Sequence, residues 1–192
     1  LERIGEYQKM EAGEENLPSE IRFVAEQIYN YLHVTKPLAF VCLTLGLLLF
    51  AVYIYCFSME RKPNRIVSYF SVGVLSAVLV FLTLLIVLRG FVSGHLPLSN
   101  GFETMQFLAW TSLLLSLLFN KKIPLLLSFG LLLCGLSLLV AMMGEANPKI
   151  TNLMPVLSSP LLSIHVMIIM LSYALLAFIM LNGLTAILLH CF

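Results

Sequence analysis

A single histidine, His165, stands about one helical turn inside a long apolar run of the sequence. Pro160 opens that run, and proline suits the first turn of a helix because its φ is fixed and its missing N–H needs no partner there. An imidazole at this depth is costly unless it faces protein, water or a ligand, and neutral imidazole is a common metal ligand. His165 is therefore a candidate binding residue, or alternatively a side chain that reaches back to the headgroup level.

A second candidate group follows the loop that ends at Asn100. Asn100 is a favourable N-cap, and Glu103 has the spacing of a capping box and suits the positive end of a helix dipole. Glu103 also shares one helical face with Gln106 and Trp110, at positions i, i+3 and i+7. Such a polar and aromatic strip normally faces the interior of a helix bundle, although Trp110 could instead belong to the aromatic belt at the membrane surface.

The remaining histidines and cysteines, and the net charge, do not indicate a further functional site. We expect His33, just before the first apolar run, to be a solvated loop residue. Four cysteines lie in apolar runs without any Cys-x-x-Cys pair, so we expect them to pack as small hydrophobic side chains and not to bind haem covalently. These are Cys42, Cys56, Cys134 and Cys191. A net charge of +1, without a basic stripe to neutralise phosphates, argues against nucleic acid, so we expect no nucleic-acid partner.

The elements that must position these residues are helices in a lipid bilayer. Of the 192 residues, 60% are hydrophobic and 11% are charged, whereas about 25% of the residues in globular proteins are charged. We therefore predict an all-α fold, a polytopic helical membrane protein with about five transmembrane helices. The expected spans are 37–59, 66–88, 102–119, 123–143 and 161 to beyond 189.

An amphipathic helix is expected to precede the first span. Ser19 is a good N-cap, and apolar residues recur after it at helical spacing. These residues are Ile21, Val24, Ala25, Ile28, Tyr31 and Leu32. We divide the chain into a polar segment containing this helix, residues 1–36, and a transmembrane bundle, residues 37–192. The sequence starts without Met and stops within an apolar run, so we expect a piece of a longer protein.

The distribution of Lys and Arg predicts the orientation in the membrane. The first and third connections between spans carry five of these residues, and the second and fourth carry two, Arg89 and Lys149. Because positively charged loops stay in the cytoplasm, we expect the N-terminal segment and the loops 89–101 and 144–160 to face outside. His165 then lies on the outer side.

Two stretches of the sequence resemble a known family. Residues 97–110 read Pro-Leu-Ser-Asn-Gly-Phe-Glu-Thr-Met-Gln-Phe-Leu-Ala-Trp. They resemble the Asn-x-(Tyr/Phe)-Glu-(Ser/Thr) segment of the cytochrome c assembly family, the CcsA/ResC type of System II haem lyase. Residues 154–174 are similar to that family's later block of Pro-x-Leu, Trp-Leu-x-x-His-Val and Ser-Tyr-Ala motifs. The resemblance covers about residues 65–192, and the preceding segment is similar to the join of a fused CcsBA form.

The resemblance implies a haem site. Members of this family hold exported haem at the outer face between two histidines, beside a Trp-rich segment, where its vinyl groups meet the Cys-x-x-Cys-His thiols of apocytochrome c. By resemblance, His165 is the first outer axial ligand of the iron of haem b. His95 is a weaker candidate ligand, and Glu103 and Trp110 are candidates to line the site. The Trp-rich segment and the second outer histidine are absent from this sequence, so the site is incomplete here.

The function implied is cytochrome c biogenesis: delivery of haem and its attachment to apocytochrome c at the outer face of the bacterial inner (cytoplasmic) membrane. Haem lyase activity is expected of the full-length protein and not of this piece alone, and no catalytic acid–base residue is predicted. The expected partners are a CcsB/ResB-like portion or subunit, apocytochrome c and the lipid bilayer. Two alternatives stay open, a transporter or permease subunit with His165 and Glu103 along a substrate path, and a structural membrane subunit without a cofactor.

Overall fold

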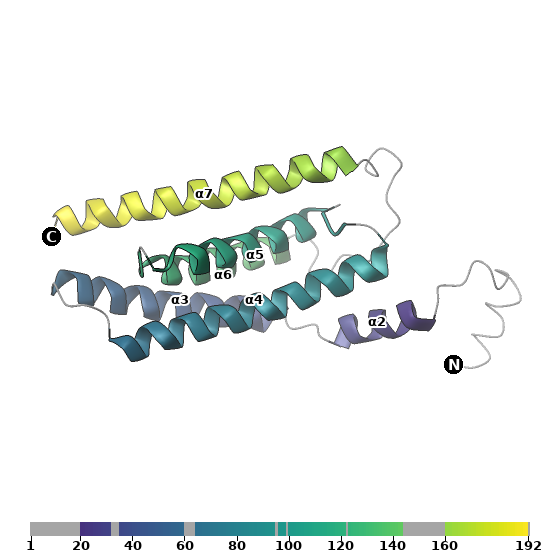
Figure 1. Cartoon of the computed structure of the whole chain (residues 1–192), viewed down its shortest axis with the longest axis horizontal. Coiled ribbons are helices and arrows are strands. Elements are labelled where there is room, and N and C mark those ends of the chain that lie inside the picture. The colour runs from purple at the N-terminus through teal and green to yellow at the C-terminus, as the bar shows by residue number, and fades with distance from the viewer. Residues whose placement is uncertain are drawn as a thin grey trace, which may run out of the picture.

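The described part of the protein is an elongated bundle of antiparallel helices (Figure 1). The computed structural model describes residues 20–31, 35–59, 64–94, 96–98, 100–121, 123–143 and 160–191. These residues form six helices and no strand, which confirms the all-α prediction. The helices are α2 (Glu20–Tyr31), α3 (Thr35–Ser58), α4 (Arg65–Ser93), α5 (Gly101–Phe119), α6 (Leu126–Met143) and α7 (Pro160–Cys191).

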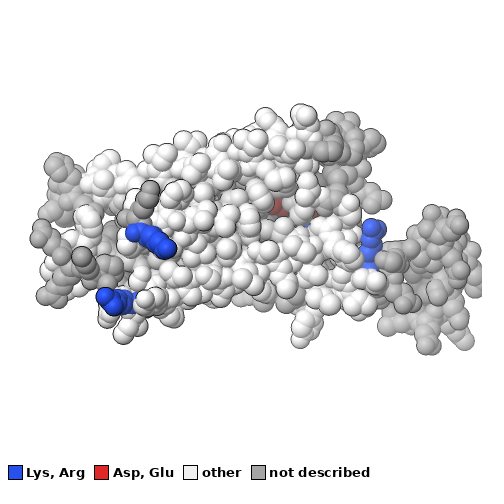
Figure 2. Space-filling model, in the orientation of Figure 1, with Lys and Arg blue, Asp and Glu red and all other residues white. Residues whose placement is uncertain are grey.

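Five of the described helices, α3 to α7, are long and apolar enough to cross a bilayer. The predicted ends of the spans agree with the structure to within three residues, except at the end of α4. There the helix continues beyond Leu88 to Ser93, because Arg89 is accommodated inside the bundle and does not begin a loop. Between the blue residues near its two ends, the face seen in Figure 2 is almost entirely white, apart from a small recessed spot of charge, as expected of a lipid-facing surface.

The centre of the bundle is α6, which packs against α3 and α5 along its length and also contacts α4 and α7. Two glycines allow α3 and α6 to approach closely. A Cβ added at Gly46 would lie 2.9 Å from the backbone N of Leu132, and one at Gly135 would lie 2.9 Å from the backbone N of Leu43. Because backbone atoms fill the space where a side chain would begin, glycine is required at this crossing.

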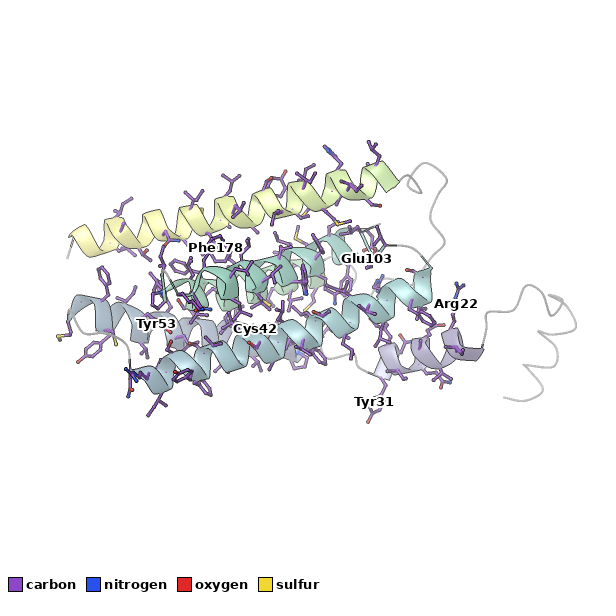
Figure 3. All side chains as sticks on the ribbon, viewed as in Figure 1. Arg22, Tyr31, Cys42, Tyr53, Glu103 and Phe178 are labelled. Carbon is purple, nitrogen blue, oxygen red and sulfur yellow. The ribbon has the colours of Figure 1, made fainter. Side chains whose placement is uncertain are left out.

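The last span, α7, rests on the bundle along a single stripe. Among its side chains that the structure describes, only Ala174, Phe178 and Thr185 are buried. Phe178 packs with Leu126 and Phe129 of α6, and Figure 3 shows it below the α7 ribbon, on the side of α5 and α6. The rest of the described surface of α7 is therefore open to lipid or to another partner.

The amphipathic helix predicted before the first span is α2, and it lies beside the C-terminal end of α4 (Figure 1). Its packing face differs from the apolar face that the sequence suggested. Ala25 and Tyr29 are buried, whereas Ile21 and Val24 are 69% and 52% exposed. Tyr31 points away from the bundle in Figure 3 and is 92% exposed. The exposed apolar residues suit a helix lying at a membrane surface.

Candidate functional site

A buried ion pair joins α4 to α5 at the end of the bundle where α4 ends and α5 begins, here called the α4–α5 end. Nε of Arg89 donates to Oε1 of Glu103 at 2.7 Å. The two side chains are 0% and 3% exposed. A charged hydrogen bond withdrawn from water in this way is among the stronger polar interactions in a protein, provided that both partners are present.

Aromatic side chains complete the surroundings of Arg89. Its Nη1 donates to the hydroxyl of Tyr29 on α2 at 2.9 Å. Its guanidinium carbon lies 5.7 Å from the ring centroid of Tyr29 and 5.2 Å from that of Phe102, within cation–π range. Arg89 thereby connects α2, α4 and α5.

The chain reverses direction between α4 and α5 through two local features. Gly94 ends α4 in the left-handed conformation, with φ at 71°, which glycine adopts without strain. Asn100 begins α5, and its side-chain oxygen accepts from the backbone N–H of Glu103 at 2.9 Å. The predicted N-cap is therefore confirmed, and the cap fixes the first turn of α5 from which Glu103 reaches Arg89.

The predicted interior strip on α5 is confirmed in its first two members. Glu103 and Gln106 are buried, and Nε2 of Gln106 has no hydrogen-bond partner among the described residues. Trp110, two turns deeper, is half-buried, and its Nε1 donates to Oγ1 of Thr83 on α4 at 2.8 Å. Its ring stacks on Phe107 with the centroids 5.7 Å apart. Trp110 therefore helps to join α4 to α5 within the span.

His165 lies on the open side of α7 and is exposed. The buried residues Ala174, Phe178 and Thr185 follow it by nine, 13 and 20 positions, so at 100° per residue they lie about 180–220° around the helix from it. The structure thus brings Glu103 to Arg89 but leaves His165 on the side of α7 that no described element covers. His95 and His33 fall outside the described residues.

No group of three or more His, Cys, Asp or Glu side chains within the described part of the chain could hold a metal ion. The thiols of Cys42 on α3 and Cys134 on α6 are buried in the core, with their sulfur atoms 4.0 Å apart. This burial confirms the expected role of these two cysteines as small hydrophobic side chains. Cys56 is half-buried, and the side chain of Cys191 lies outside the described residues.

Sequence reasoning missed Arg89, which donates to Glu103, and Tyr29, whose hydroxyl accepts from Arg89. Arg89 was expected in a loop because it follows an apolar run directly, but it is the most deeply buried cation that the structure describes. A signal for it exists in the sequence: an arginine ends one span and a glutamate begins the next, 14 residues later. In an antiparallel pair of helices, such residues come to the same depth. Tyr29 carries no comparable signal.

The comparisons with known proteins agree with this architecture. Residues 98–191 match the model of the family described as Cytochrome C assembly protein. This span begins in the α4–α5 loop and contains α5, α6 and α7, so it includes Glu103, Trp110 and His165. The chain is a multi-pass helical membrane protein whose residues from the α4–α5 loop through α7 match the cytochrome c assembly protein family, and the resemblance seen in the sequence is confirmed.

Among curated proteins the chain is similar to the CcsA type. It is 37% identical over 143 residues to the cytochrome c biogenesis protein CcsA of Trieres chinensis. The aligned region covers 68% of this chain and 44% of that protein. It is also 37% identical over 175 residues to Protein NrfI of Wolinella succinogenes. This aligned region covers 90% of this chain and 19% of that protein. The chain therefore spans less than half the length of these relatives.

Proposed function

We propose that the full protein containing this chain acts in cytochrome c biogenesis, by delivering haem b and promoting its covalent attachment to apocytochrome c. The family match and the similarity to proteins named for cytochrome c biogenesis support this role. They do not favour the two alternatives, a transporter subunit and a structural subunit. Haem is then the substrate that the protein handles, and apocytochrome c is the partner that receives it.

The observation that carries the proposal is the position of His165. It lies one turn from the start of α7, on an uncovered face, beside exposed apolar side chains that include Leu161 and Ile168. Haem offers a flat apolar ring and an iron that takes imidazole as an axial ligand, so an uncovered apolar face with one imidazole fits one side of it. The second ligand and the Trp-rich segment would come from parts of the protein beyond this chain.

The chemistry proposed for the full protein is thioether formation. A cysteine thiol of apocytochrome c adds across a vinyl group of haem, so that sulfur bonds one vinyl carbon and the hydrogen passes to the other. The contribution of this chain is to hold and orient the ring through His165, since positioning alone lowers the barrier of a reaction between two bound groups. No acid–base pair is required of the residues described.

The α4–α5 end is proposed to face the outside of the bacterial inner membrane, where α7 also begins. The spans alternate in direction, so α4 ends at the same end of the bundle as α5 and α7 begin. His95, Glu103 and Trp110 remain candidates to lie near haem. The contact of Glu103 with Arg89 supports a role in positioning the loop that carries His95. A CcsB/ResB-like portion is the proposed partner on the side of α2.

Replacement of His165 by alanine in the full-length protein tests the proposal. We expect the variant to lose at least about 90% of the haem that copurifies with the wild type, because a lost axial ligand costs well over 1.4 kcal/mol, the equivalent of a tenfold change. The measurement is the Soret absorbance per mole of protein. Ile164→Ala, a neighbouring exposed residue of α7, is the matched control and should retain haem.

Imidazole distinguishes a lost ligand from a damaged fold. In His165→Gly protein, added imidazole should restore the Soret band, since it supplies the missing nitrogen. An unchanged haem spectrum in His165→Ala would refute the assignment, and so would equal losses in His165→Ala and Ile164→Ala.

A further inference from the structure

A cleft of about 480 Å³ lies away from His165, between α2 and the C-terminal end of α4. Its apolar walls include Ile86, Val87 and Phe91 of α4 and Leu96 and Pro97 of the following loop. Of the described residues that line it, Arg22 of α2 is the only one with a charged side chain. A volume of this size suits part of a small ligand with a long apolar portion.

The cleft lies at the depth where hydrocarbon meets headgroups. With 29 residues, α4 is about 43 Å long, whereas the hydrocarbon core of a bilayer is about 30 Å thick. At the average tilt of transmembrane helices, about 20°, a helix of this length extends beyond the hydrocarbon core, and the cleft is built on its last two turns. Exposed apolar residues of α2, Ile21, Val24 and Ile28, place that helix at the same level.

Arg22 brings a positive charge to the mouth of this cleft. Its Nη2 lies 3.6 Å from the position that a Cβ on Gly94 would take, so the guanidinium reaches across to the end of α4, as Figure 3 also indicates. The carbonyl groups at the end of α4 favour a cation there. Among the described residues, no carboxylate pairs with Arg22, not even Glu26 one turn along α2, and Arg22 lines the cleft.

We propose that this cleft binds an anionic phospholipid, with an acyl chain along the apolar wall of α4 and the phosphate on Arg22. The apolar walls match an acyl chain, and the planar guanidinium matches phosphate with two parallel hydrogen bonds. The bound lipid fills the space between α2 and α4 that their own side chains leave open. The site is independent of haem, and it does not rest on the function proposed above.

Native mass spectrometry of the full-length protein tests the site. The protein is first reconstituted in equal amounts of phosphatidylglycerol and phosphatidylcholine, and the lipids retained after transfer to detergent are counted. The wild type should retain phosphatidylglycerol in preference to phosphatidylcholine. Arg22→Gln should lower the fraction that retains phosphatidylglycerol about tenfold or more, because the two charged hydrogen bonds to phosphate are lost. Val87→Phe, which fills the cleft, should lower it by a similar factor.

Two matched controls make the same kinds of substitution on α4 but outside the cleft. Arg65→Gln removes an exposed arginine at the opposite end of α4, and Val80→Phe enlarges an exposed residue of α4 outside the cleft. Both should retain phosphatidylglycerol like the wild type. Equal retention of the two lipids by the wild type would overturn the proposal. So would equal losses in Arg22→Gln and Arg65→Gln, or the recovery of a porphyrin from this cleft in place of phospholipid.

Discussion

Arg89 and Glu103 hold each other's charges out of water and lipid at the α4–α5 end. Their pairing does not by itself make the protein more stable than an apolar pair of the same size, because desolvation of both ions offsets much of the attraction. The consequence appears when one partner is removed, since the other charge is then buried and uncompensated. The pair therefore specifies how α4 and α5 meet, together with the cap at Asn100.

The first prediction concerns this pair. Glu103→Gln should lower the free energy of unfolding by about 3 kcal/mol, because Arg89 stays buried without a counter-charge. The measurement is thermal or denaturant unfolding of the purified full-length protein in detergent. Glu26→Gln, which removes an exposed carboxylate from α2, should change the stability by less than about 0.5 kcal/mol.

A double variant separates the charge from the packing. Arg89→Met combined with Glu103→Met should recover most of the lost stability, since neither charge remains buried. A Glu103→Gln protein as stable as the wild type would show that the ion pair is not what holds α4 to α5.

Among the helices, the crossing of α3 and α6 is the most demanding contact. Gly46 and Gly135 each face the backbone of the other helix, so α3 and α6 meet twice along one interface. Backbone atoms cannot rotate away as a side chain could. The crossing therefore tolerates no Cβ without a shift of one helix against the other.

Gly135→Leu should destabilise the bundle by about 3 kcal/mol or more, because its Cβ would meet the backbone N of Leu43 at 2.9 Å and the backbone O of Ala39 at 3.1 Å. The matched control is Gly183→Leu on α7, where a Cβ would meet nothing within 4 Å. Resistance to trypsin in detergent measures the difference. Equal digestion of the two variants would contradict the close crossing.

The helices themselves were predictable from the sequence, because long apolar runs leave few alternatives in a membrane. The N-cap at Asn100 was also predictable, since capping depends on residues within one turn. The end of α4 was not, because the burial of Arg89 depends on Glu103 in the next span and on Tyr29, 60 residues away. Contacts between residues so far apart in the chain cannot be predicted from the local sequence.

The face of α2 that packs on the bundle could not be predicted from the sequence either. Its periodicity marked Ile21, Val24 and Ile28, but a helix at a membrane surface can direct its most apolar side chains to lipid. Ala25 and Tyr29 pack instead, because the small side chain allows close approach and the hydroxyl meets Arg89. Of the candidate site, His165 could be placed near a helix start, whereas its position opposite the contact stripe of α7 depends on packing.

At the scale of the whole molecule, the alternating spans give the bundle two chemically different ends. The α4–α5 end carries the buried ion pair, the cleft lined by Arg22 and the start of α7. The opposite end carries exposed Arg65 and Lys121. The cationic residues of this opposite end are those expected to remain in the cytoplasm.

Cysteine labelling checks this orientation. Leu161→Cys, at the start of α7, should react with a membrane-impermeant maleimide added to intact spheroplasts, whereas Lys121→Cys should react only after the membrane is opened. Both positions are exposed, so access to the reagent and not burial decides the outcome. The reverse pattern would place His165 on the cytoplasmic side and exclude the proposed site for haem transfer.

The ion pair also constrains the order in which the chain can enter the membrane during synthesis. When Arg89 leaves the ribosome, Glu103 lies 14 residues behind it and is still inside the exit tunnel, so Arg89 has no counter-charge and must stay hydrated. Its burial becomes favourable only when α5 arrives 14 residues later. The two spans are therefore expected to settle together as a hairpin, and the loop between them is fixed in place as they do so.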